Sequence, residues 1–153
     1  MVQLVRIFVR LFLDFKAKAE SHETLKVISD QVSCPTSSDS LALACWRSIQ
    51  LNGIAEKESK LHWSDAGVAS WYDFAIAIGE ISLEIGLLQK AAIVKPIPSN
   101  QYPIIARRPS FSLLDCKSTI EMLKLEPDHW RYALRKVLIK IKEKKIIYND
   151  INS

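Results

Sequence analysis

Short apolar, strand-like runs alternate along this chain with longer segments of helical periodicity, and this alternation constrains the fold most strongly. The runs cover residues 25–29, 61–63 and 93–97, and the first is rich in β-branched side chains. Alternating strands and helices favour an α/β architecture. Strands this short usually need more sheet to pair with, so the sequence predicts a helix-rich lobe that lacks part of its fold.

The segments between these runs repeat apolar side chains at three-, four- and seven-residue steps, which is typical of amphipathic helices. We expect helices over residues 3–18, from Thr36 or Ser37 to about 50, from Ser70 to about 85, over 117–123, and from Asp128 onward. Ser70 opens a capping-box pattern, and Asp128 is the expected cap of the last helix. Gly86 is the expected terminator of the third helix.

Apolar stripes identify one face of each of two helices. The second helix groups Leu41, Ala42, Cys45, Trp46 and Ile49 on one face. The residues expected on the inner face of the last helix, toward the core, are Trp130, Ala133, Leu134, Val137, Leu138 and Ile141.

The bulk composition is that of an ordinary globular domain. The 153 residues are enough for one domain with a core, and 48% hydrophobic and 25% charged residues are common values. The net charge of +4 is concentrated partly in residues 140–145. A nucleic-acid or lipid patch is one reading, but the interleaved Glu143 favours the solvated end of a helix. We therefore expect neither a nucleic acid nor a membrane as a partner.

The cysteines and the N-terminal segment indicate a cytoplasmic protein. Cys34, Cys45 and Cys116 are odd in number and lack metal-ligand spacing, so we expect reduced thiols and no metal site. Residues 1–15 are mostly apolar, which is also a feature of signal peptides. Because Arg6 and Arg10 interrupt the run and it is too short to cross a bilayer, we expect a buried helix.

Two adjacent arginines lie in a proline-bounded segment that is a poor helix and a poor central strand. Arg107 and Arg108 follow Pro103 and precede Pro109, and each proline removes a backbone donor and favours extended backbone. The sequence predicts a stiff loop that presents guanidinium groups. The planar guanidinium suits bidentate binding of phosphate or carboxylate.

Four stretches resemble, in order, the C-terminal part of dTDP-4-dehydrorhamnose reductases, which are extended short-chain dehydrogenases/reductases. Residues 102–115 carry every residue of the family pattern Tyr-Pro-x-x-Ala-x-Arg-Pro-x-x-Ser-x-Leu-Asp. Residues 27–36 are similar to Val-x-x-Asp-Gln-x-Gly-x-Pro-Thr, with Ser33 in place of the glycine. Residues 62–75 and 129–135 resemble a strand-to-helix segment and the closing helix of the family.

The resemblance implies a site and a reaction. Complete relatives transfer hydride from NADPH to the C4 ketone of dTDP-6-deoxy-L-lyxo-4-hexulose. This chain would supply the lobe that binds the dTDP-sugar, over residues 1–139, before a basic helix end and tail over 140–153. The implied substrate-binding residues are Arg108, Arg107, Gln31, Asp30 and Thr36, although turn chemistry also explains Asp30 and Thr36. If the position of Ser33 needed a positive φ, the serine would strain the pocket loop.

The chain carries neither of the two features that the hydride transfer needs. Its glycines stand alone at positions 53, 67, 79 and 86, so no glycine-rich dinucleotide loop is present and no cofactor site is expected. A Tyr-x-x-x-Lys pair occurs at Tyr132 and Lys136, on one face of the closing helix, which is the wrong end of the family pattern. We expect a surface pair there and no catalytic residue.

Three functions stay open at this point. The first is a substrate-binding part that is inactive alone and uses a Rossmann-containing chain supplied in trans. The second is a non-catalytic binding or regulatory module, because relatives include a regulatory subunit of methionine adenosyltransferase. The third is a truncated gene remnant that folds poorly.

Overall fold

The computed structural model describes residues 15, 18, 21, 23–51, 60–102 and 108–151, with side chains up to residue 144. The elements are β1 (Thr24–Ile28), β2 (Val32–Ser33), α2 (Ser38–Gln50), β3 (Ala69–Ser70), α4 (Trp71–Glu84), β4 (Ile93–Ile97), the 3-10 turn η1 (Ser99–Gln101), α5 (Lys117–Leu123) and α6 (Trp130–Ile151). The expected α/β class is confirmed. Most of the helix expected over 3–18 lies outside the described residues, as does Arg107.

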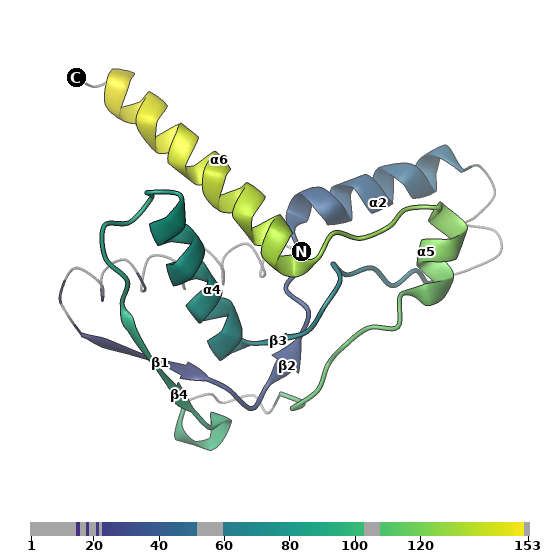
Figure 1. The fold of residues 1–153 in the computed structure, drawn as a ribbon. Helices are drawn as coiled ribbons and strands as arrows, with labels where there is room; N and C mark the ends of the chain where they lie inside the picture. The colour runs from purple at the N-terminus through teal and green to yellow at the C-terminus, as the bar shows by residue number, and fades with distance from the viewer. Residues whose placement is uncertain are drawn as a thin grey trace.

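Two small sheets organise the strands. β1 pairs in parallel with β4, in a register that sets Thr24 beside Ile93 and Ile28 beside Ile97. β2 pairs antiparallel with β3 through Val32 and Ser33. Figure 1 shows α4 running along the β1–β4 sheet, with α2 and α5 together on the other side of the short β2–β3 sheet. The β2–β3 pair therefore lies between the two halves of the lobe.

The main core lies between α4, α6 and the β1–β4 sheet. Phe15, Ile78 and Leu138 are fully buried in it, and Trp130 and Leu134 extend it along α6. The inward stripe expected for the last helix is confirmed, with Val137 and Ile141 half-buried at its margin. A smaller cluster joins α2 to α5 through Ala44, Trp63 and Leu123.

Local caps explain where the helices begin and end. Ser37 accepts a hydrogen bond from the Ser40 N–H at the start of α2. Ser70 and Asp73 form the complete capping box that the sequence predicts for α4. Gly86, at φ +68, follows the end of α4 in the left-handed conformation that favours glycine.

Two expectations about local structure were wrong. Residues 61–63 are not a strand, because the His62 N–H donates to the Thr119 hydroxyl and the Trp63 indole donates to Ser40. Asp128 does not cap α6 with its carboxylate, which pairs with Lys136 about two helical turns further on. The Arg131 N–H is satisfied instead by Nδ1 of His129, and the Trp130 N–H by the Ala66 carbonyl.

The apolar stripe of α2 is largely exposed. Leu43, Trp46 and Ile49 are 53%, 61% and 66% exposed, and Ala44 is the buried residue of this helix. Of the predicted stripe, Leu41 packs against the α2–α5 cluster, whereas Ala42, Cys45, Trp46 and Ile49 are exposed. The buried Ala44 does not belong to that stripe, so the periodicity identified the exposed face of α2.

Basic side chains of α6 are paired within the lobe. Arg131 and Arg135 bind Glu80 and Glu84 on α4, at 2.7 and 2.6 Å. Lys140 pairs with Asp39, and Lys142 donates to the Ile85 carbonyl at the end of α4. These contacts attach the basic part of α6 to α2 and α4. None of the helices described is long and apolar enough to cross a membrane.

Candidate functional site

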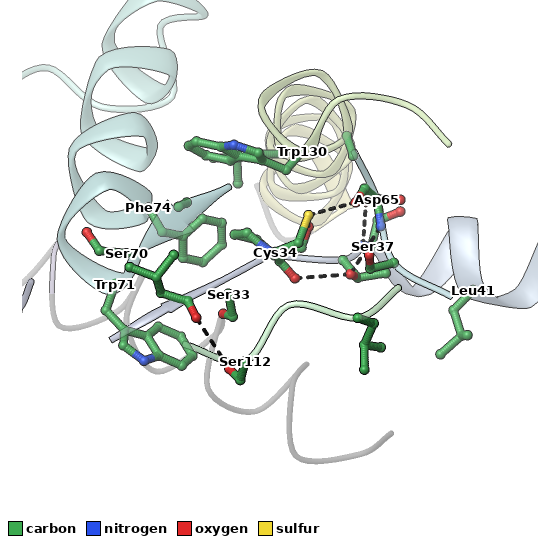
Figure 2. A pocket seen from close by; sticks show the side chains of 18 of the residues that line it. Ser33, Cys34, Ser37, Leu41, Asp65, Ser70, Trp71, Phe74, Ser112 and Trp130 are labelled. Atoms are coloured by element: carbon green, nitrogen blue, oxygen red, sulfur yellow. Dashed lines mark hydrogen bonds between the residues drawn. The ribbon is translucent and has the colours of Figure 1, made fainter. Parts of the chain in front are cut away.

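An open pocket of about 670 Å³ lies between the two halves of the lobe. Its walls come from the segment between β2 and α2, the β3–α4 junction, the first turns of α6 and the segment that begins at Arg108. In Figure 2, Phe74 and Trp130 lie on one side of the pocket, Ser112 lies below them, and Asp65 and Ser37 lie toward α2. A concave, mostly apolar site with a few polar groups is the usual form of a small-molecule site.

Aromatic side chains build the apolar wall. Phe74 and Trp130 pack edge to face, with their ring centroids 6.1 Å apart. Both are buried core residues, as the sequence predicts, and both also line the pocket together with Trp63 and Trp71. Flat apolar surfaces of this kind suit a nucleobase or the apolar face of a sugar ring.

Arg108 lines the pocket from an exposed segment that is fixed to β2. The Val32 N–H donates to the Ser110 carbonyl at 2.8 Å, and the Ser112 N–H donates to the Val32 carbonyl at 2.9 Å. This pairing holds the chain just after Arg108 along the pocket wall. The guanidinium can therefore bind an anionic group at the rim.

Gln31 and Thr36, two of the predicted site residues, also line the pocket. Gln31 is 8% exposed, and none of the residues that the structure describes bonds its side-chain amide. The Thr36 hydroxyl donates to the Cys34 carbonyl and accepts from the Asp65 N–H. The turn chemistry considered for Thr36 is therefore present, whereas the Gln31 amide has free hydrogen-bonding capacity.

Asp30 does not line the pocket. Its carboxylate accepts from the Ser99 N–H at 2.9 Å and from the Ser99 hydroxyl at 3.0 Å. The backbone hydrogen bond from Ser99 lowers the pKa of Asp30 below its usual value. Asp30 thus joins the turn after β1 to the turn after β4.

Ser33 is unstrained. It lies in β2 opposite Ala69, and the described non-glycine residue with a positive φ is Lys124, in the turn after α5. The position of Ser33 does not need a positive φ, so the strain that such a conformation would cause does not arise.

The environment of the pocket thiol of Cys34 favours its protonated form. It donates to the Asp65 carbonyl, and burial, followed by the nearby Asp65 carboxylate, raises its pKa to about 11. Thiolate is the reactive form, so this environment opposes nucleophilic chemistry. The described residues contain no group of three His, Cys, Asp or Glu side chains that could hold a metal ion.

Tyr132 and Lys136 lie on one face of α6, as their spacing predicts. The Lys136 ammonium lies 4.4 Å from the Tyr132 ring centroid and pairs with Asp128, which raises the pKa of Lys136. Tyr132 is 54% exposed, and neither side chain lines the pocket. The pair has the surface position that we expect from the sequence.

Several pocket residues were not found by sequence reasoning. Asp65, Ser37 and Ser112 line the pocket, although Ser37 was expected only as a helix cap and Ser112 only as part of the family pattern over residues 102–115. Their contribution depends on long-range backbone pairing, such as that between Val32 and Ser112. No spacing rule in the sequence carries that information.

The fold is an α/β lobe, and its pocket has the form of a small-molecule site. Comparison with known proteins identifies the family. Residues 7–143 match the family described as RmlD substrate binding domain, so the chain belongs to that family. The resemblance to dTDP-4-dehydrorhamnose reductases seen in the sequence is thereby confirmed. The predicted boundary at residue 140 falls within α6, which is continuous through it.

Similar proteins include curated enzymes and solved structures. The dTDP-4-dehydrorhamnose reductase of Aggregatibacter actinomycetemcomitans is 30% identical over 121 residues, which are 78% of this chain and 41% of that protein. The spore coat polysaccharide biosynthesis protein SpsK of Bacillus subtilis is 36% identical over 121 residues, 78% of this chain and 38% of that protein. The chain thus spans about two fifths of these relatives.

The solved structures agree on the fold. A dTDP-4-dehydrorhamnose reductase of Clostridium acetobutylicum superposes with a TM-score of 0.71 at 26% identity, over 88% of this chain and 44% of that one. The dTDP-4-dehydrorhamnose reductase of Bacillus anthracis, crystallised in complex with NADP, superposes with a TM-score of 0.66 at 20% identity. The match covers 89% of this chain and 42% of that one.

Proposed function

We propose that this chain binds the dTDP-sugar substrate of a dTDP-4-dehydrorhamnose reductase in the pocket beside Arg108. The observation that carries the proposal is that Gln31, Thr36 and Arg108, which match the family motifs, line one pocket with an aromatic wall. In the proposed mode, Arg108 binds the diphosphate, the aromatic side chains contact the base or sugar ring, and Gln31 donates or accepts a further hydrogen bond with the ligand.

Titration calorimetry with dTDP-L-rhamnose tests this binding mode. Arg108→Ala removes a charge-assisted hydrogen bond worth about 1.5–3 kcal/mol, so the affinity should fall by about 10- to 100-fold. Arg135→Ala is the matched control, because Arg135 pairs with Glu84 and does not line the pocket. Equal affinities for the wild type and Arg108→Ala would contradict the proposed role.

We further propose that reduction of the keto-sugar by NADPH uses a Rossmann-containing chain supplied in trans. The β1–β4 sheet supports this, because parallel sheets are almost always larger and covered on both faces. Leu25 and Val94 pack into the core, whereas Ile93 is 67% exposed and Lys26 lies directly beside Lys95. Adjacent lysines repel each other unless an acidic group lies nearby. A Rossmann-containing chain that docks on this sheet could supply such a group.

An assay of NADPH oxidation with the keto-sugar tests this second step. The chain alone should give no turnover, and addition of the Rossmann-containing part of a relative should restore it. Turnover by the isolated chain would contradict the proposal that it acts only as the substrate-binding part.

A second candidate function is a non-catalytic module that binds another protein. The exposed stripe of Leu43, Trp46 and Ile49 on α2 favours it, because contiguous exposed apolar side chains often mark interaction sites. Stable capture of a protein partner, lost in Trp46→Ser and accompanied by no binding of dTDP-L-rhamnose, would select this function over the first.

A further inference from the structure

Asp65 is a buried carboxylate with one oxygen that the fold does not use. The residue is 3% exposed and lines the pocket. Its Oδ1 atom is buried and has no hydrogen-bond partner among the residues that the structure describes. A buried acceptor without a partner is unfavourable, and because Asp65 lines the pocket, a ligand group that reaches Oδ1 and donates to it would relieve this cost.

The remaining polar atoms of Asp65 hold it rigidly in place. Its N–H donates to the Thr36 hydroxyl at 3.3 Å, and its carbonyl accepts from the Cys34 thiol at 2.7 Å. Its Oδ2 accepts from the Ser37 N–H at 2.9 Å, at the start of α2. The next residue, Ala66, bonds through its N–H to the Asp128 carbonyl and through its own carbonyl to the Trp130 N–H.

This arrangement separates two functions of the carboxylate. Oδ2 completes the cap of α2, where a negative charge is favourable. Capping does not use Oδ1. Because the backbone of Asp65 is fixed on both sides, Oδ1 is positioned before any ligand arrives, which lowers the entropic cost of binding.

The pocket therefore has a cationic side and an anionic side. The segment that begins at Arg108 is bonded to Val32, whereas Asp65 is bonded to residues 34–37, further along the same stretch toward α2. Figure 2 shows Ser112, from the Arg108 segment, well apart from Asp65. A ligand with an anionic end and a hydroxyl-bearing end matches this polarity.

From this geometry we infer that Oδ1 of Asp65 accepts a hydrogen bond from a hydroxyl of the hexose, and that Asp65 is a specificity-determining residue of the pocket. The inference rests on the proposed function, in which Arg108 takes the diphosphate. It assigns the sugar to the α2 side of the pocket. A nucleotide that lacks the hexose, such as dTDP, would not reach Asp65.

The test compares two ligands, dTDP-L-rhamnose and dTDP, on the wild type and on Asp65→Asn, by titration calorimetry. The asparagine keeps an oxygen for the Ser37 N–H but removes the charged acceptor at Oδ1. We expect the affinity for dTDP-L-rhamnose to fall about tenfold and the affinity for dTDP to stay within twofold. Asp39→Asn is the control, because Asp39 pairs with Lys140 on the surface of α2.

The outcomes separate the inference from the function on which it rests. If the wild type binds neither ligand, the proposed function fails. If the wild type binds dTDP-L-rhamnose and Asp65→Asn binds it equally well, the inference fails and the function stands. Should Asp65→Asn not fold, monodeoxy analogues of dTDP-L-rhamnose on the wild type decide the matter, since removal of one hydroxyl should cost about tenfold and a uniform affinity would overturn the inference.

Discussion

Replacement of Gly79 by alanine tests how tightly α4 packs in the core. Gly79 lies in the middle of α4 and is fully enclosed. A Cβ atom at this position would lie 2.5 Å from Cζ of Phe15 and 3.1 Å from its Cε2. Real Cβ contacts are longer, so the Phe15 ring would have to move, and a side chain that is 1% exposed moves at the expense of its packing.

Two opposing effects set the size of the change. Alanine is a better helix former than glycine by about 1 kcal/mol, which would stabilise α4. Overpacking of a buried site costs about 1–3 kcal/mol. Because the clash is with a rigid aromatic ring, we expect overpacking to prevail and the free energy of unfolding to fall by up to about 2 kcal/mol.

Urea denaturation followed by circular dichroism at 222 nm measures this change. Gly79→Ala should unfold at lower urea than the wild type, with an unchanged slope. In a Phe15→Leu background, the same substitution should cost less or become stabilising, because the ring edge is absent. A Gly79→Ala protein that is about 1 kcal/mol more stable than the wild type would refute the packing of Phe15 on α4.

Three further predictions follow from local contacts. Ser70→Ala removes the cap of α4 and should lower the free energy of unfolding by about 1 kcal/mol in urea; no change would contradict a role for the cap. Iodoacetamide at pH 8 should alkylate the exposed Cys45 quickly and Cys34 slowly, with the Cys34 rate rising toward its pKa of about 11; equal rates at pH 8 would contradict its burial. The Asp30 carboxyl should titrate by NMR below the usual range of an aspartate, and Ser99→Ala should leave its pKa lowered, because the dominant backbone N–H remains. Since the folded pKa is the lower one, this stabilisation is complete above the unfolded pKa and is lost as the pH falls through the folded pKa.

Local signals in the sequence predicted most of the fold. Ser37, Ser70 and Gly86 act at the helix ends where capping rules place them. The strands β1 and β4 were also located, because each is a short run rich in β-branched residues. These features depend on neighbours within a few residues, which a sequence shows directly.

Features that depend on distant partners were missed. The run at 61–63 has strand-like residues, but the Thr119 hydroxyl takes the backbone N–H that a strand neighbour would need. Asp128 has a capping residue type, yet Lys136 takes its carboxylate. The role of Asp65 in the pocket depends on bonds to Cys34 and Ser37, about thirty residues away.

The candidate site was predicted in part. The family motifs singled out Gln31, Thr36 and Arg108, and the fold brings these three residues to one pocket. Asp30 lies outside it, and its carboxylate accepts from the N–H of the distant Ser99. A family motif therefore marks a region of the fold, while hydrogen bonds to residues far away in the sequence decide which of its side chains line the pocket.

The tryptophan indole N–H signals in a ¹H–¹⁵N NMR titration with dTDP-L-rhamnose test the central claim most directly. The chain has four tryptophans: Trp63, Trp71 and Trp130 line the pocket, whereas Trp46 is exposed on α2 outside it. Binding in the pocket should shift the first three signals in a saturable way and leave the Trp46 signal unchanged. A titration that shifts no indole signal, or shifts Trp46 alone, would contradict the proposal that this lobe binds a nucleotide-sugar.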